Sequence, residues 1–124
     1  MTALALISTS GWCCTCVSPD SFVESQLTRD RIVRGTALIF HARVTAVHSD
    51  RSAEVEVLEH FKGAAPKLLR PSAKPESACG TSLKVGEERV FFMQSPTADV
   101  ISCNKYPVTP QLIEILRQRN NGAI

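Results

Sequence analysis

The chain has 124 residues, of which 44% are hydrophobic and 21% are charged, and its formal net charge is +2. This length favours one domain with a modest core. The nearly balanced charge argues against a nucleic-acid-binding protein, which would present a strongly basic face. No stretch approaches the roughly 20 apolar residues that a membrane-spanning helix requires.

The first thirteen residues are rich in small and apolar side chains. The apolar run from Ala3 to Ile7 has no charged residue before it, and it is shorter than the segment of about 7–15 residues typical of a secretion signal. We interpret residues 1–13 as the remnant of a leader. Cleavage after Cys13 would leave Cys14 as the first residue. Residues 14–120 then form a single domain, and residues 121–124 form a tail.

A short helix is predicted after this leader. Ser18 can cap it and Pro19 suits its first turn, and the apolar residues that follow indicate one short helix ending before Arg34-Gly35. The basic cluster within it, Arg29 to Arg34, is interrupted by Asp30. It is typical of a solvated helix face, with a heparin-like polyanion as the alternative reading.

The next segment has the pattern of a β-hairpin. From Thr36 to His48, apolar and polar residues alternate as in a strand with one buried face. A turn at residues 49–52 leads to a second strand from Ala53 to Phe61, in which Leu58 breaks the alternation and predicts a β-bulge. The residues expected on the buried face of the first strand are Leu38, Phe40, Ala42, Val44 and Ala46.

Three further strands and a second helix complete the prediction. The strands are expected at residues 67–70, 89–93 and 99–103, and the helix runs from Thr109-Pro110 to Arg119. Its predicted buried stripe consists of Leu112, Ile113 and Leu116. Five short strands, one bulge and two small helices predict a mainly β fold in the form of a small, curled barrel.

The cysteines indicate the compartment. Cys13, Cys14 and Cys16 are clustered near the start, whereas Cys79 and Cys103 stand alone. Zinc sites usually need closely spaced pairs of ligands, whereas distant cysteines in a small domain are typical of disulfides formed outside the cytosol. We therefore expect a secreted or periplasmic protein whose N-terminal segment is stapled to two distant places on the folded body.

No residue pattern points to an enzyme. The Cys13-Cys14 pair lacks the spacing of a redox motif. His41 and His48 are seven residues apart on one strand, so they face opposite sides and cannot share a metal ion; His60 is expected at the surface. We predict no catalytic residues and no cofactor.

At the cysteines the sequence resembles a known family. The run Cys14-Thr15-Cys16-Val17, followed by Phe22 and the strand Ala37 to Val44, is similar to the N-terminal domain of tissue inhibitors of metalloproteinases, which is a netrin-like domain. The likeness covers most of the chain and is most specific at the cysteines. Pieces similar to bacterial relatives of the group are Phe61-Lys62-Gly63, Cys79-Gly80, Val85-Gly86-Glu87 and Cys103.

The resemblance implies a five-stranded OB-type barrel, closed or partly open, with disulfides Cys14–Cys79 and Cys16–Cys103. It also implies an inhibitory edge formed by Cys14, Thr15, Cys16 and Val17. In that family, the α-amine and carbonyl oxygen of the first cysteine chelate the zinc of the target protease. Here the backbone of Cys14 would do so, Thr15 would enter the specificity pocket and Val17 would lie along the cleft. The implied partner is a zinc metalloprotease, bound by a monomer.

Two features of the chain depart from the animal inhibitors. The cysteine that starts their third bridge, just after the equivalent of Phe22, is missing, and Cys13 is an extra residue. Bacterial members of the group need not inhibit a protease. The alternative is therefore an extracellular or envelope adaptor that binds a protein through the surface of its barrel.

Overall fold

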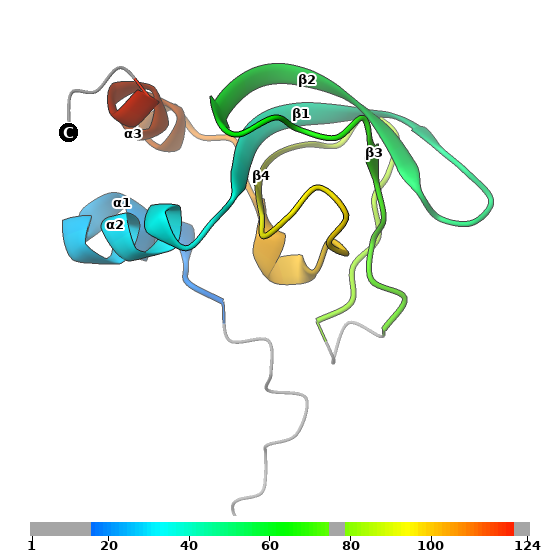
Figure 1. Ribbon diagram of the computed structural model, residues 1–124, viewed down its shortest axis with the longest axis horizontal. Coiled ribbons are helices and arrows are strands. Elements are labelled where there is room, and N and C mark those ends of the chain that lie inside the picture. Colours follow the sequence, from blue (N-terminus) through cyan, green and yellow to red (C-terminus); the bar gives the residue numbers. More distant parts are fainter. Residues whose placement is uncertain (1–15, 75–78, 121–124) are drawn as a thin grey trace, which may run out of the picture.

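The computed structural model describes residues 16–74 and 79–120 (Figure 1). The predicted leader and tail, with Cys14 and Thr15, lie outside these residues. The described elements are α1 (Pro19–Glu24), α2 (Gln26–Arg34), β1 (Leu38–Val47), β2 (Ala53–Lys62), β3 (Leu68–Leu69), β4 (Glu88–Met93), the 3-10 helix η4 (Ser102–Asn104), β5 (Lys105–Tyr106) and α3 (Pro110–Asn120). The five strands form an antiparallel sheet in the order β3-β2-β1-β4-β5. The mainly β prediction is confirmed.

The long hairpin of β1 and β2 bends the sheet. His41 pairs with Glu59 and Ala42 with Val57, so Leu58 is the extra residue of a bulge, as the sequence predicted. Two further register shifts lie in the same strand pair. Because each bulge increases the local twist and bends the strand, the sheet curls into a half-barrel (Figure 1).

Hydrogen bonds across the open side hold this curl. The backbone N–H of Val100 donates to the carbonyl of Arg70 at 2.7 Å, and the N–H of Ser72 donates to the carbonyl of Val100 at 2.8 Å. Pro71 and Val100 thereby form a parallel bridge. The segment after β3 is thus joined to the segment before β5.

The last strand was predicted at the wrong place. Ser102–Asn104 forms η4, and β5 follows at Lys105–Tyr106. The side chain of Asn104 accepts a hydrogen bond from the N–H of Ile101 at 2.8 Å and donates one to the carbonyl of Phe92 at 2.7 Å. These two bonds stabilise a tight turn where the sequence pattern had indicated an extended strand.

The N-terminal region contains two helices instead of the single predicted helix. Ser18 caps α1 as expected, but Ser25 ends α1 and its side chain caps α2. Arg29 then donates to the carbonyls of Phe22 at 3.2 Å and Val23 at 2.7 Å. Since the last carbonyls of a helix have no partner within it, this arginine stabilises the break between α1 and α2.

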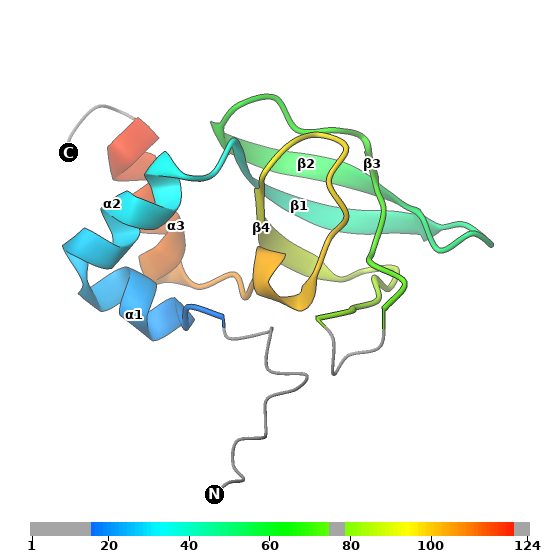
Figure 2. The same ribbon diagram turned by 60° about the horizontal axis from the view of Figure 1, so that its bottom comes forward.

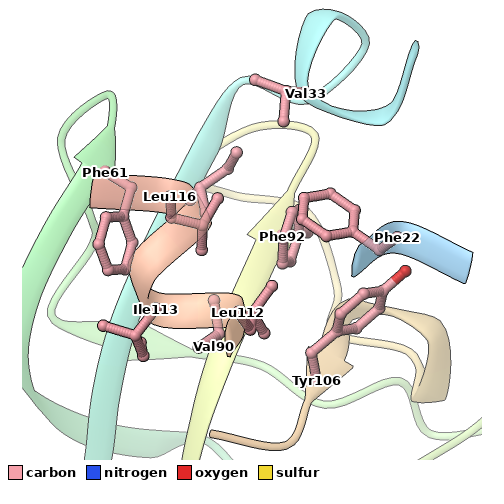
Figure 3. Packing of buried hydrophobic residues seen from close by; sticks show 10 residues of the cluster. Phe22, Val33, Phe61, Val90, Phe92, Tyr106, Leu112, Ile113 and Leu116 are labelled. Atoms are coloured by element: carbon pink, nitrogen blue, oxygen red, sulfur yellow. The ribbon is translucent and has the colours of Figure 1, made fainter. Parts of the chain in front are cut away.

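The sheet has a hydrophobic cluster on each face. Alternate residues of β1 and β4 point to opposite faces of the sheet. One face lies inside the half-barrel and the helices cover part of the other, so both strands have buried residues on both faces. The cluster inside the half-barrel consists of Leu38, Phe40, Ala42, Val44, Ala53, Leu69, Leu83, Phe91, Met93 and Val100. The cluster under the helices, in Figure 3, consists of Phe22, Val33, Ile39, Phe61, Val90, Phe92, Tyr106, Leu112, Ile113 and Leu116. The predicted helix stripe is confirmed.

Two glycines have a positive φ: Gly63, directly after β2, and Gly86, shortly before β4. Gly63 has a φ of +69°, and a Cβ there would lie 2.6 Å from the carbonyl oxygen of Ala37. Gly86 has a φ of +90°, but a Cβ there would meet nothing within 4 Å. We expect Gly86→Ala to cost about 1–2 kcal/mol from its backbone conformation alone.

Gly63→Ala should cost at least about 1 kcal/mol more, because the backbone carbonyl must also shift. Urea denaturation of both variants measures the difference. Equal midpoints would show that residues 37 and 63 can move apart without cost.

Candidate functional site

A disulfide bond fixes the start of the described chain. Cys16 is bonded to Cys103, which lies in η4; the two Cα atoms are 5.1 Å apart, and the residues are 87 positions apart in the sequence. This is one of the two pairings that the resemblance implies. It attaches the segment before α1 to the segment before β5.

Cys79 lies beside this disulfide. The N–H of Ser102, the neighbour of Cys103, donates to the carbonyl of Cys79 at 3.0 Å. Cys79 is buried and is itself disulfide-bonded; its predicted partner, Cys14, lies outside the described residues. Figures 1 and 2 show the three segments at one end of the molecule: the blue start, the yellow-green segment after residue 78 and the orange η4. We call residues 16–17, 79–82 and 102–103 the cysteine edge.

Tyr106 anchors the residue after Cys16. Its hydroxyl donates to the carbonyl of Val17 at 2.9 Å, while its ring packs against those of Phe22 and Phe92, with centroids 6.1 Å and 4.8 Å away. Burial raises the pKa of Tyr106, so the hydroxyl keeps the proton that it donates. The side chain of Val17 remains 39% exposed.

Long side chains from the sheet fix the segment after Cys79. Arg51, at the tip of the β1–β2 hairpin, donates to the carbonyl of Thr81 at 2.8 Å. Lys105 of β5 donates to the carbonyl of Ser82 at 3.0 Å. Cys79 has a φ of +73°, a conformation uncommon for a residue other than glycine. The two hydrogen bonds hold Thr81 and Ser82, which closely follow it in the chain.

Glu87 connects this segment to β4 and β5. Its carboxylate accepts hydrogen bonds from Lys105 and Arg89 at 2.9 Å each, and from the N–H of Lys84 at 3.1 Å. Burial opposes ionisation of Glu87, but the bonds from Lys105 and Arg89 outweigh it, so the pKa of Glu87 lies below its usual value. The carboxylate is therefore ionised and structural at neutral pH.

A hollow of about 380 Å³ adjoins the cysteine edge. Its polar members Thr36 and Asn104 already bond to the backbone. The rest of its wall is largely apolar, which suits a side chain of a bound protein better than a charged small molecule. Residues of the edge and its rim that line it are Cys16, Val17, Cys103, Tyr106, Gln94 and Asp99.

His41 and His48 each contact a carboxylate: His41 lies 2.9 Å from Glu88, and His48 lies 2.8 Å from Glu54. The expectation that both histidines lie on one strand was wrong, because β1 ends at Val47. His60 is exposed, as expected. Within residues 16–74 and 79–120, no cluster of three or more His, Cys, Asp or Glu side chains is placed to hold a metal ion. In the same ranges, no helix has the length and apolar character needed to cross a membrane.

The sequence did not single out the residues that support the cysteine edge. The supporting hydrogen bonds are donated by Tyr106, Arg51 and Lys105 to carbonyls 89, 30 and 23 positions away in the sequence. No local sequence pattern indicates such a bond. Of the predicted edge residues, the structure places Cys16 and Val17, while Cys14 and Thr15 are outside the described residues.

No protein-family model matches the chain, and no curated protein matches its sequence.

The Cys16–Cys103 bond should contribute strongly to stability. A loop of this length corresponds to about 4–5 kcal/mol in the chain-entropy model, and we expect about 2–4 kcal/mol because the disulfide at Cys79 already constrains the unfolded chain. The double variant Cys16→Ser, Cys103→Ser should therefore lower the urea midpoint. Ser102→Ala is the neighbouring control and should change stability by less than about 0.5 kcal/mol. An unchanged midpoint in the double variant would assign the bond no net stabilising role.

Glu87 should make the fold sensitive to acid. A carboxyl group with a lowered folded-state pKa stabilises the fold above its unfolded pKa, about 4.3, and this contribution is lost as pH falls through the folded value. Glu87→Gln should therefore be less stable than the parent at neutral pH, and the difference should shrink below about pH 4.

Urea midpoints measured from about pH 7 to pH 3 test this expectation. The matched control is Glu114→Gln on the exposed face of α3, where the difference from the parent should stay small at every pH. A difference for Glu87→Gln that is constant with pH would contradict the role of its charge.

Proposed function

We propose that this chain is an exported, netrin-like OB-type domain that binds protein, and that the segment from Cys14 to Val17, which leads into its cysteine edge, inhibits a zinc metalloprotease. The observation that carries the proposal is the double anchoring of residues 16 and 17. The disulfide holds Cys16 and the hydroxyl of Tyr106 holds Val17. The residues directly before them, Cys14 and Thr15, therefore start from a fixed point on the folded body.

A fixed terminus is suited to chelate a metal in another protein. Catalytic zinc keeps one coordination position for water and can expand to five-coordinate, so an amine and a carbonyl oxygen of the same residue can displace that water as a five-membered chelate. A free α-amine has a pKa of about 8, so the metal deprotonates it easily. Anchoring reduces the entropy that is lost on binding. In this proposal, the backbone of Cys14 supplies both donor atoms.

The position of Cys79 supports the proposed Cys14–Cys79 pairing. Cys79 is hydrogen-bonded through its carbonyl to Ser102, next to the cysteine that holds Cys16. Two residues of extended chain span about 7 Å, so Cys14 is within reach of this side of the edge. With this pairing, both ends of the Cys14-Thr15-Cys16 segment are held by disulfides.

The rest of the edge supplies the protein–protein contact. Thr15 enters the specificity pocket of the protease, and the exposed side chain of Val17 lies along its cleft. The apolar hollow beside Val17 receives a side chain from the rim of that cleft. Disulfide bonds support an oxidising location, secreted or periplasmic, and export with cleavage after Cys13 exposes the amine of Cys14.

The decisive experiment compares two proteins with the same disulfides. Cleavable fusions produce one protein that begins at Cys14 and one in which a single alanine precedes Cys14. The first should inhibit a member of a zinc-metalloprotease panel. The second should be weaker by roughly 100-fold or more, because the amine has become an amide and a central contact is lost.

Equal inhibition by both proteins would contradict chelation by Cys14. No inhibition by either one, with both disulfides present in a non-reduced peptide map, would favour the adaptor function. In that case the barrel surface would be the working part of the molecule.

Thr15→Gly provides a second test on the protein that begins at Cys14. Removing the side chain that fills the specificity pocket should weaken inhibition by roughly tenfold or more. An unchanged inhibition constant would show that Thr15 does not occupy the pocket.

A further inference from the structure

The outer face of α2 carries an exposed apolar residue and two arginines whose side chains have no partner among the described residues. Leu27, Arg31 and Arg34 are four and three positions apart, so they lie on one face of the helix. Leu27 is 69% exposed. Arg31 and Arg34 are also exposed, and neither forms an ion pair or a side-chain hydrogen bond with another described residue. Uncommitted guanidinium groups are available to bind a carboxylate in two-pronged fashion.

A hollow of about 340 Å³ opens at the end of the same helix. Its floor is formed by the edges of four residues of the helix-covered core: Val33, Ile39, Phe61 and Leu116. Its rim carries three cations, Arg34, Lys62 and Arg119. The site thus combines an apolar base with a positively charged opening.

Two of the rim cations are held in place by the fold. Lys62 donates to the carbonyl of Val33 at 2.7 Å, and Arg119 pairs with Asp30 at 2.9 Å. Together with Arg31 and Arg34, the described residues named for this surface are four cations and one carboxylate, that of Asp30. The net charge of this region is therefore +3 (four minus one), although the whole chain carries only +2.

The hollow and the helix face form one elongated surface. A second hollow, lined by Leu27, Arg31, Arg34 and Gly35, shares Arg34 with the first. From residue 27 to residue 34 the helix rises by about 10 Å, which is the length of about three extended residues. An extended peptide matches this shape better than a compact small molecule does.

We infer that this α2 surface, comprising Leu27, Arg31, Arg34 and the adjoining hollow, docks an acidic peptide segment of a partner protein. An apolar side chain of the peptide enters the hollow, and its carboxylates bind Arg34 and Arg31. The surface is separate from the cysteine edge. In Figure 3, Phe61 and Leu116 lie at the opposite side of the cluster from Tyr106, which anchors Val17. The inference therefore does not depend on protease inhibition.

The test uses the full chain and the peptide N-acetyl-Glu-Leu-Glu-Leu-amide as a probe. Methyl NMR spectra of the protein are recorded during a titration to millimolar peptide. The methyl signals of Val33, Ile39 and Leu116, which line the hollow, should shift in a saturable way. A peptide with glutamine in place of glutamate and a peptide with alanine in place of leucine should each bind more weakly.

Two charge reversals separate specific docking from general attraction. Arg34→Glu should weaken binding by about tenfold or more, since a charge-assisted contact becomes repulsive. Lys67→Glu changes the net charge of the protein by the same amount at an exposed position before β3, and it should leave the affinity nearly unchanged. Both residues are exposed, so both variants should fold.

Several results would overturn the inference. These are the absence of methyl shifts, equal binding of the glutamine peptide, and an equal effect of the two charge reversals. Binding to vesicles of anionic phospholipid, lost in Arg34→Glu and without any peptide-induced shift, would assign the surface to a membrane instead.

Discussion

Burial of β1 and β4 on both faces is the constraint on which the rest of the structure depends. Phe40 and Phe91 stack inside the half-barrel with centroids 5.4 Å apart, while their neighbours Ile39 and Phe92 point the other way into the helix-covered cluster. Because apolar surface on the outer face must also be removed from water, all three α-helices pack on that side. This packing brings Val17, near the start of the described residues, to Tyr106.

The irregular segments at the cysteine edge have defined hydrogen-bond partners for three of their carbonyls. A carbonyl that lacks a sheet or helix partner can be satisfied by a side chain from elsewhere in the fold. At the cysteine edge, the carbonyls of Val17, Thr81 and Ser82 accept hydrogen bonds from Tyr106, Arg51 and Lys105. The disulfide adds a covalent constraint to the same place. Segments without regular structure thus become a defined surface.

The charges of the molecule are segregated. Acidic residues on the outer face of the sheet are each paired with a cation or a histidine; they are Glu54, Glu56, Glu59 and Glu88. Arg31 and Arg34 of α2 lack such partners among the described residues. The helices therefore carry a basic surface even though the net charge of the chain is small. The cysteine edge is the more apolar of the two candidate binding surfaces.

The sequence by itself determined the hairpin, the bulge at Leu58, the cap at Ser18 and the stripe of the last helix, because burial and local propensity leave a periodic pattern in neighbouring residues. Only the tertiary structure decided the break at Ser25, the turn η4 and the support of the cysteine edge. The break at Ser25 depends on side chains that bond to the backbone three to seven positions away. The turn and the edge depend on bonds to more distant backbone groups, as Asn104 forms with Phe92 and Tyr106 with Val17. Such bonds follow from how the sheet curls and the helices pack, and that geometry has no counterpart in local sequence.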